Sequence, residues 1–533
     1  MLFDEVLDQV GEFKKYQIRC FLLSQYMVLM LGFGVTMLPV FILATPKHRC
    51  AIPGINDTWA IQDDDHELLL NQTIPPGSQC TFFDFQDNGT EKPCALWVYD
   101  NEIFRPSAVE EFNTVCDRKI YRAVTNMVYF MGLLCGGLVG GQLSDRFGRR
   151  VVIYVAVFPF VIASNGMAFS PNIFVLMACR FVQSTCCMSY FAAALVLLME
   201  LTGRKRRSMI APMTDAVFVC GYVLMTLPAY YIRNWRYLTL TVGVFQLPLV
   251  GLGWFIPESP RWLMTMNRKE EAEKIIQRAA HVNGRKIPKN ILDSVDAHVS
   301  KEEGNFLQLL KYRATGVRLI VFGVNWAAAS TVYYGLSLNA GNLSGNIFVN
   351  VALLAAIDLP AAMFILFAPM KFGRKRTHAF SFLLGGTACL ATILVVVFGR
   401  EVTWAYQFLS IIGKFGAAAG FASVYLFTME LHPTALRSQS LGFCSMCARI
   451  ASLCAPFISD LGTYMPGRFS EAMPLIVFGL LSVIAGLTSF FLPETHNRPL
   501  PASIEEARNF GRRSKHPTSN KRDTGDKNNM VEL

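Results

Sequence analysis

The sequence predicts an all-α membrane protein in which 12 transmembrane helices form two pseudo-symmetric six-helix halves. The first observation is composition: 52% of the 533 residues are hydrophobic, only 17% are charged, and the mean hydropathy is +0.34. A soluble domain carries about 25% charged residues. The second is a series of apolar stretches, each close to the roughly 20 residues that cross a bilayer. The third is a set of motifs that occurs once in each half.

Twelve apolar stretches predict the membrane-spanning helices. The first is too long for a signal-peptide core and has no clear cleavage site, so we expect it to remain as the first helix. The stretches cover residues 18–44, 121–143, 150–168, 172–201, 208–232, 236–256, 316–338, 345–369, 376–398, 402–430, 437–460 and 472–492.

Three motifs of the first half recur in the second half in the same order and at a nearly constant spacing. Such a repeat indicates two parallel halves that face each other across a central cavity, an architecture typical of alternating-access transport. The pairs are GGQLSDRFGRR from Gly140 with MKFGRKR from Met370, LMELTGRKRR from Leu198 with TMELHPTALR from Thr428, and PESPRW from Pro257 with PETHNRP from Pro493.

The domain organisation follows from these stretches. The first half covers residues 1–257 and contains a large polar loop, 45–119, and the second half covers 316–504. The charged linker, 258–315, contains helical spacing and is predicted to form cytoplasmic helices against the bundle. The tail, 505–533, is polar and basic, and we expect it to be disordered. Its last three residues, Val-Glu-Leu, could add a strand to a PDZ domain; the alternative is a plain tail.

The formal net charge of +10 raises the question of nucleic-acid binding. The basic residues instead sit in short turns between apolar stretches, as in the cytoplasmic loops of membrane proteins. We therefore expect no nucleic-acid partner. The same rule places both termini in the cytoplasm and the loop 45–119 outside.

The large loop carries the features of an oxidising, extracellular compartment. Its even number of cysteines predicts two disulfides, and all three pairings stay open. The cysteines are Cys50, Cys80, Cys94 and Cys116, and the predicted glycosylation sites are Asn56, Asn71 and Asn88.

Charged residues at the cytoplasmic helix ends are predicted to act in gating. Opposite charges can pair across the halves only while those helix ends touch, so their separation would accompany opening to the inside. The alternative is a purely topological role. The residues are Asp145, Arg146, Arg149, Arg150, Glu200 and Arg204 in the first half and Gly373, Arg374, Glu430 and Arg437 in the second.

A charge inside the membrane should face a cavity or a partner. Arg449 lies near the middle of the eleventh stretch among small neighbours, where a guanidinium could bind a carboxylate through two parallel hydrogen bonds. The alternative is a structural ion pair with Asp215 or Asp358. Arg180 and Lys414 are also intramembrane, and each could equally bond backbone carbonyls of a neighbouring helix.

Aromatic residues at helical spacing are predicted to line the same site. Aromatic rings suit bulky organic solutes and can hold an ammonium group by cation–π attraction. For any single ring, contact with lipid is the alternative. The candidates are Tyr230 in helix five, Trp326, Tyr333 and Tyr334 in helix seven, and Phe421 and Tyr425 in helix ten.

The sequence contains no enzymatic constellation. It has no Walker A loop, no H-E-x-x-H motif, no paired C-x-x-C motifs and no G-x-S-x-G motif. The run from Asp63 to His66 is better explained as a solvated acidic loop than as a metal site. We therefore expect neither enzymatic activity nor a cofactor or metal.

Several motifs resemble the major facilitator superfamily and, within it, solute carrier family 22, the transporters of organic cations, organic anions and carnitine or zwitterions. The resemblance covers about residues 1–500. Its marks are ATPKHRC, FNTVCDRK, GQLSDRFGRR, PESPRWL, VYYGLSLNAG, ELHPT and LPET. The resemblance implies a polyspecific uniporter or exchanger of small organic ions at the plasma membrane.

The resemblance also carries substrate-site positions onto this chain. Organic anion carriers place a lysine where this chain has Ala362, and organic cation carriers place an aspartate where it has Arg449. The carnitine-type branch has arginine at the latter position. Positions on helices five, seven and ten correspond to aromatic site positions of the family. Many members have six loop cysteines, whereas this loop has four, so its disulfide pattern is expected to differ.

Together these observations favour a carrier of zwitterions or carboxylate-bearing solutes such as carnitine and betaines. The alternatives are an organic anion exchanger, a transport-inactive receptor or scaffold on the same bundle, and a channel, which would need a continuous pore.

Overall fold

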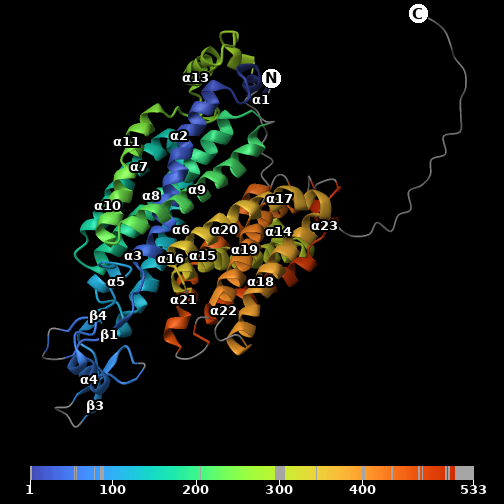
Figure 1. The fold of residues 1–533 in the computed structure, drawn as a ribbon. Coiled ribbons are helices and arrows are strands. Elements are labelled where there is room, and N and C mark those ends of the chain that lie inside the picture. The colour runs from blue at the N-terminus through green and yellow to red at the C-terminus, as the bar shows by residue number, and fades with distance from the viewer. Residues whose placement is uncertain are drawn as a thin grey trace, which may run out of the picture.

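The structure is a computed structural model, and it confirms the predicted helical membrane fold. It describes residues 3–52, 55, 57–76, 78–84, 89–203, 206–294, 307–343, 345–398, 403–433, 436–465, 469–470, 472–498, 501 and 504–510. The helices form two groups, one from each half of the chain, with the loop region extending from one end (Figure 1).

The first group contains six membrane-length helical segments. Its elements are α1 (Phe3–Val10), α2 (Lys15–Leu31), η1 (Gly32–Thr36), α3 (Leu38–Ile42), α4 (Asp64–Thr73), α5 (Ala108–Glu111), η3 (Cys116–Arg118), α6 (Ile120–Phe147), α7 (Arg149–Gly166), η4 (Met167–Phe169), α8 (Ile173–Leu201), η5 (Arg207–Met209), α9 (Ile210–Tyr231), α10 (Trp235–Gln246), α11 (Pro248–Leu252) and η6 (Gly253–Phe255). The linker forms α12 (Pro260–Thr265), α13 (Lys269–Val282), η7 (Ile291–Ser294) and α14 (Leu307–Lys311).

The second group repeats the first. Its elements are α15 (Arg313–Asn339), η8 (Ala340–Asn342), α16 (Ile347–Ala356), α17 (Asp358–Phe372), α18 (Arg374–Phe398), α19 (Thr403–Leu431), α20 (Arg437–Ser452), α21 (Ala455–Ser459), η10 (Leu461–Tyr464), α22 (Met473–Thr488), η11 (Ser489–Phe491) and α23 (Ile504–Asn509).

Eleven of the predicted spans are helices long and apolar enough to cross a membrane within the described residues. The twelfth is α20 followed by α21. The helix is interrupted between Ser452 and Ala455, just before Pro456, which has no N–H to continue the helical ladder. Arg449 therefore lies in the last turn of α20, directly before a break that sequence periodicity did not indicate.

The tail departs from its prediction at its start. Residues 504–509 form α23 because the Arg318 guanidinium binds the last carbonyls of this turn, including that of Phe510 at 2.6 Å.

Some predicted functional residues lie outside the described residues. They are Arg204, Asn56 and Asn88, together with residues 511–533, which include the predicted PDZ-binding end. Arg437 and Arg449 are described.

Glycines bring the helices of each half into close contact. A Cβ placed on Gly136 of α6 would lie 2.9 Å from the carbonyl carbon of Thr185 in α8. In the second half, Gly385 of α18 lies against the backbone of Gly416 in α19, where a Cβ would approach Cα at 3.1 Å. Small residues allow such backbone approach in membrane helices. These close contacts allow the helices of each half to pack tightly.

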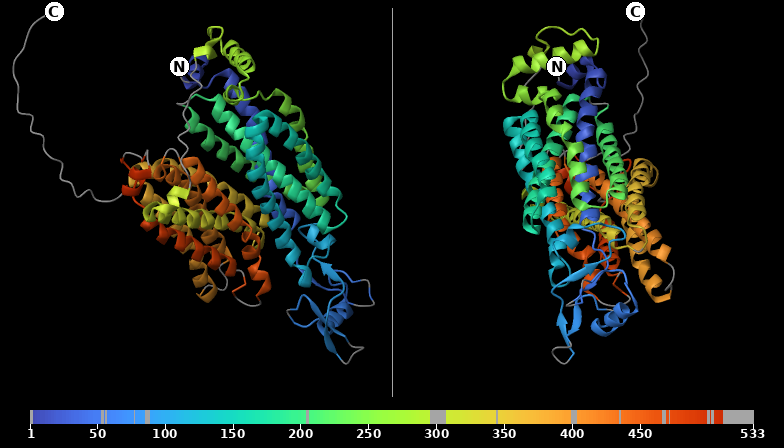
Figure 2. Two further views of the ribbon diagram at one scale, coloured as in Figure 1. Left: turned by 180° about the vertical axis from the view of Figure 1, so that it is seen from behind. Right: turned by 60° about the vertical axis from the view of Figure 1, so that its left-hand side comes forward.

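We call the end of the molecule that carries residues 45–119 the loop end and the end that carries the basic turns the turn end. The two halves touch at the loop end. Phe41 stacks on Phe348 with centroids 5.7 Å apart, and Arg122 donates to Asn342 Oδ1 at 2.9 Å. Lys119 donates to the carbonyl of Thr463 at 2.9 Å. Toward the turn end the two groups of helices diverge (Figures 1 and 2).

The loop itself is a small disulfide-linked unit. β1 (His48–Cys50) pairs antiparallel with β4 (Trp97–Tyr99), and β2 (Thr81–Asp84) pairs with β3 (Thr90–Pro93). Of the three pairings left open by the sequence, the structure contains Cys50–Cys94 and Cys80–Cys116.

Removing the Cys80–Cys116 disulfide is expected to lower the stability of this loop. A disulfide that closes a segment of this length constrains the unfolded chain by about 3–4 kcal/mol. The double variant Cys80→Ser, Cys116→Ser should expose the loop to limited proteolysis under conditions in which the parent resists. Cys454→Ser, which removes an exposed free thiol, is the matched control. Equal protease resistance of the double variant and the parent would contradict the role assigned to the bond.

Candidate functional site

Five of the predicted binding residues form one aromatic cluster between α15 and α19. The ring centroids of Trp326 and Tyr425 lie 4.1 Å apart. Those of Tyr333 and Phe421 lie 5.7 Å apart, and Tyr334 lies 5.2 Å from Tyr333. Helical spacing places the rings of each helix near one face. The two helices therefore present facing aromatic stripes.

The cluster has a buried side and an open side. Trp326 is fully buried at 0% exposure, and its indole Nε1 donates to Thr428 Oγ1 at 3.0 Å. Tyr425 is 40% exposed, while Tyr334 and Phe421 are half-buried. The last three rings therefore form the accessible side of the cluster, and the buried Trp326 lies behind them.

Arg449 extends from α20 toward α6 of the other half. Its Nη1 donates to the carbonyl of Leu133 at 3.3 Å, and a Cβ placed on Gly137 would lie 3.4 Å from its Cζ. The side chain is half-buried, and it forms no ion pair with a carboxylate in the described parts of the chain. Phe130, one turn before Leu133 in α6, has its ring centroid 5.1 Å from that of Tyr334 in the cluster. The guanidinium thus has free hydrogen-bonding capacity beside the cluster.

Asp215 of α9 provides the opposite charge from the other half. Its side chain is exposed, and among the described residues it makes neither an ion pair nor a hydrogen bond. From the sequence, Asp215 was predicted mainly as a counter-ion for an intramembrane basic residue. The available sequence signal was that Asp215 lies in an apolar helix and has no basic residue one turn away to pair with.

Lys414 belongs to a separate buried network. It is 1% exposed, and its Nζ donates to Ser337 Oγ at 2.6 Å and to the carbonyl of Tyr333 at 3.2 Å. The same Nζ lies 3.9 Å from Asp358 Oδ2, which also accepts a hydrogen bond from the Tyr333 hydroxyl at 2.7 Å. Lys414 and Asp358 therefore hold Tyr333 in place, and Asp358 is the partner of Lys414 rather than of Arg449.

Tyr230 is not part of the cluster. It lies in the last turn of α9, which ends at Tyr231, and it is 50% exposed. Its ring lies 5.5 Å from Phe348 and beneath the Arg233 guanidinium at 4.9 Å. The helix was correctly identified, but the register places this ring at the loop end.

At the turn end, the predicted gating charges pair within each half. Arg149 Nη2 lies 3.2 Å from Glu200 Oε1 and 3.0 Å from Asp145 Oδ1. Arg374 Nε lies 3.1 Å from Glu430 Oε1. Pairing of these charges across the halves, as the sequence suggested for a conformation with touching turn ends, stays a prediction.

The third repeated motif completes each turn. Glu258 accepts the backbone N–H of Arg149 at 2.9 Å, and Glu494 accepts that of Arg374 at 2.8 Å. These acids satisfy the free N–H groups at the starts of α7 and α18. Backbone hydrogen bonds help to hold the pKa of Glu494 below its usual range, although burial alone would raise it. The echoes seen in the sequence thus mark equivalent contacts in the two halves.

The remaining gating candidates have less defined surroundings. Arg146 is exposed and lies over the ring of Phe147, and Arg150 is exposed with its Nη2 near the carbonyl of Trp254. Arg437 is half-buried and forms no ion pair within the described residues.

Comparison with known proteins decides the family. The family described as "Sugar (and other) transporter" matches residues 81–506. The chain is 32% identical to human "Organic cation/carnitine transporter 2" over 530 residues, which cover 95% of this chain and 93% of that protein. It is 31% identical to the "Organic cation transporter protein" of Drosophila melanogaster, with 96% of each chain covered. The chain belongs to solute carrier family 22 of the major facilitator superfamily.

Solved structures support the fold of this family 22 chain. It superimposes on the inward-open xylose transporter XylE from E. coli with a TM-score of 0.58, 16% identity and coverage of 90% and 98% of the two chains. A partially occluded structure of XylE gives a TM-score of 0.60 at 15% identity, with 91% and 100% covered. Family membership makes the chain a multi-pass membrane transporter and not an enzyme.

The repeated turns of this family 22 chain depend on their glycines. Gly373 has φ +92°, and a Cβ there would lie 2.7 Å from Glu494 Oε2. Gly373→Ala is therefore expected to lower the free energy of unfolding by about 2 kcal/mol, measured as a fall in the thermal unfolding midpoint of the purified protein. Gly442→Ala is the control, because no atom lies within 4 Å of its Cβ position. Equal midpoints for the two variants would contradict this account.

Proposed function

We propose that this chain transports zwitterionic or carboxylate-bearing organic solutes across the plasma membrane by alternating access. The favoured solutes have a carboxylate at one end and an ammonium at the other, as carnitine and betaines do. Family membership makes organic ions the general class of cargo. The name of the human relative, an organic cation/carnitine transporter, supports the narrower class.

The observation that carries the proposal is a pair of opposite charges contributed by the two halves. Arg449 comes from the second half and Asp215 from the first, and neither has an ion-pair partner among the described residues. A guanidinium suits a carboxylate, because it can donate two parallel hydrogen bonds. A carboxylate suits an ammonium. One zwitterion could therefore satisfy both side chains at once.

The aromatic rings add a surface for the ammonium end. Tyr334, Phe421 and Tyr425 form the open side of the cluster, and the face of an aromatic ring attracts a quaternary ammonium by about 0.5–2 kcal/mol. Such rings also tolerate solutes of different shape. This tolerance is consistent with transport of several related solutes rather than one.

Binding between the halves would link the solute to alternating access. The two charges belong to different halves, so a solute that bridges them favours conformations in which the halves are close. We infer that the loop end lies outside the cell, because it contains two disulfides and the exposed sequon residue Asn71. The basic turn end, and with it both termini, would then lie in the cytoplasm.

Solute competition tests the proposal. In cells that express the chain, uptake of labelled carnitine should be saturable and should be inhibited by unlabelled betaine more strongly than by choline or glutarate. Choline has the ammonium without the carboxylate, and glutarate has carboxylates without the ammonium. Varying sodium and membrane potential in the same assay identifies the driving force.

Each other result favours a different function. Strongest inhibition by glutarate, with faster uptake into glutarate-loaded cells, would favour an organic anion exchanger. Strongest inhibition by choline would favour a cation carrier. No uptake and no counterflow of any solute by reconstituted protein would favour a transport-inactive receptor or scaffold.

A further inference from the structure

Arg180 is a buried cation to which the described residues offer no hydrogen bond and no ion pair. It lies in α8, is 0% exposed, and none of its three guanidinium nitrogens has a hydrogen-bond partner in the described residues. It forms no ion pair with any described carboxylate. Its Cζ lies over the ring of Tyr129, 4.7 Å from the ring centroid.

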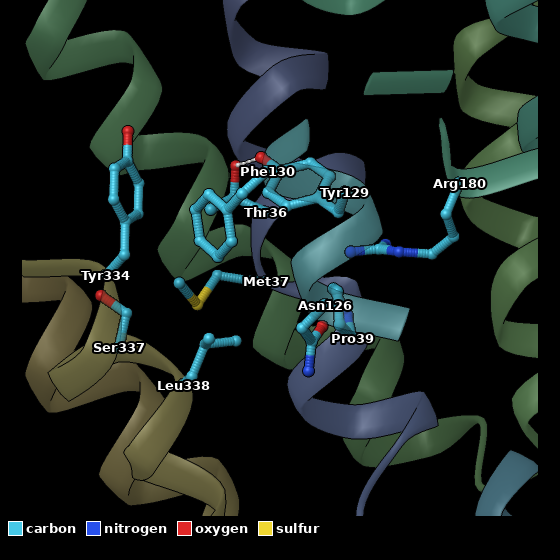
Figure 3. Close-up of a pocket in the computed structure, with 10 residues that line it drawn as sticks. All are labelled: Thr36, Met37, Pro39, Asn126, Tyr129, Phe130, Arg180, Tyr334, Ser337 and Leu338. Atoms are coloured by element: carbon cyan, nitrogen blue, oxygen red, sulfur yellow. Dashed lines mark hydrogen bonds between the residues drawn. The ribbon is translucent and has the colours of Figure 1, made fainter. Parts of the chain in front are cut away.

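The guanidinium points into a small cavity between the two halves (Figure 3). The first half contributes Asn126 and Tyr129, and the second contributes Tyr334 and Ser337. The cavity has a volume of about 10 Å³, close to the minimum that one water-sized particle needs. Asn126 is 6% exposed, and its Oδ1 also lacks a hydrogen-bond partner within the described residues. The Arg180 guanidinium is thus a buried donor with unused bonding capacity at this cavity, and Asn126 can add a donor by turning its amide N–H groups toward an anion.

An arginine in this position keeps its charge, because the guanidinium is not deprotonated in proteins. Burial of an unpaired charge is costly, and attraction to one aromatic ring compensates only part of that cost. A carboxylate of the chain would normally complete the compensation, but none of the described carboxylates does so. The remaining source of negative charge is a ligand.

We propose that the Arg180 cavity binds one small monovalent anion of halide size, such as chloride. The volume excludes an organic solute, while the guanidinium and the amide of Asn126 can both donate to an anion. This site is distinct from Arg449. The rings of Phe130 and Tyr334, with centroids 5.1 Å apart, border the cavity on the side of the aromatic cluster.

The position of the cavity also assigns the anion a conformational effect. Tyr334 and Ser337 close the cavity from the second half, so separation of the halves at the loop end would open it. The bound anion therefore stabilises the conformation in which the loop ends touch. This inference does not depend on the solute class proposed above.

Thermal unfolding of the purified full-length chain in nanodiscs tests the site. The midpoint should rise by about 3 °C or more when chloride replaces gluconate at constant sodium and ionic strength, and the rise should saturate with concentration. Bromide should replace chloride. Arg180→Met should abolish the rise, and Arg449→Met should retain it.

Several results would contradict the proposed anion site at Arg180. A parent protein without a chloride-dependent shift would overturn the proposal. Loss of the shift in Arg449→Met with retention in Arg180→Met would place the anion at the solute site and would equally overturn it. If Arg180→Met does not fold, Asn126→Leu, which fills the cavity, is expected to abolish the shift instead, and an unchanged shift in that variant counts against the site. Because the measurement is binding and not uptake, its failure leaves the proposed solute class untouched.

Discussion

Replacing Arg449 with glutamine is expected to lower the uptake of a zwitterion such as carnitine by about 100-fold, because loss of one partner of a hydrogen-bonded charge pair costs roughly 3 kcal/mol. Uptake of a solute without a carboxylate should change by less than about threefold, since it makes no such bond. Initial rates of labelled uptake, corrected for the amount of protein at the cell surface, measure both effects.

Asp215→Asn provides the reciprocal experiment. Asp215→Asn should lower the uptake of solutes that carry an ammonium and leave the uptake of solutes that carry only a carboxylate unchanged. Arg285→Gln is the matched control for Arg449→Gln, because it removes an exposed arginine of the linker. If Arg449→Gln transports zwitterions like the parent, the arginine is structural. If it reduces uptake of all solutes equally, the arginine does not distinguish them by charge.

Replacing Lys414 with methionine is expected to destabilise the protein by about 3–5 kcal/mol, because it leaves the carboxylate of Asp358 buried without its counter-charge. Asp358 is 6% exposed and Lys414 is 1% exposed, so water cannot readily replace the lost partner. The thermal unfolding midpoint of the purified protein, together with the amount of chain that reaches the cell surface, measures the loss.

The double variant Lys414→Met, Asp358→Asn should recover much of this stability, because it removes both charges. Lys371→Met is the control, since Lys371 is exposed near the turn end, and such a change is expected to stay within about 0.5 kcal/mol. A double variant no more stable than Lys414→Met would mean that the charge pair is not the source of the destabilisation.

The repeated motifs predicted the fold well, because an internal duplication constrains long-range structure. Gly148 and Gly373 both adopt positive φ, and Glu258 and Glu494 both accept the N–H groups that follow these turns. Equivalent sequence in equivalent turns predicts equivalent contacts. The same signal did not say whether Arg149 would pair inside its own half, because that depends on the conformation.

The candidate site was only partly predictable. Helical spacing places Trp326 and Tyr333 on one side of α15, and they do share a cluster. Spacing identifies a helix face but not the height along the membrane or the neighbouring helix, and Tyr230 therefore lies at the loop end instead. The missing partner of Arg180 also could not be recognised, because sequence does not show which buried charges find a counter-ion.

The pairing of the intramembrane charges could not be predicted from the sequence, because it depends on how distant helices pack. Lys414 and Asp358 are far apart in sequence, and their pairing depends on the packing of α17 against α19. Asp215 and Arg449 belong to different halves, so their separation depends on how far the halves have rotated. Three-dimensional structure was needed to see that Lys414 lies 3.9 Å from Asp358, whereas Asp215 and Arg449 form no ion pair with each other in the described part of the chain.

Equilibrium binding of carnitine and of carnitine methyl ester to purified parent and Arg449→Gln protein tests the central claim most directly. The two ligands differ only at the carboxylate, so the comparison isolates the bond to the guanidinium. We expect Arg449→Gln to lower the affinity for carnitine by about 100-fold and to change the affinity for the ester by less than about threefold. Equal weakening of both ligands, or of neither, would contradict it.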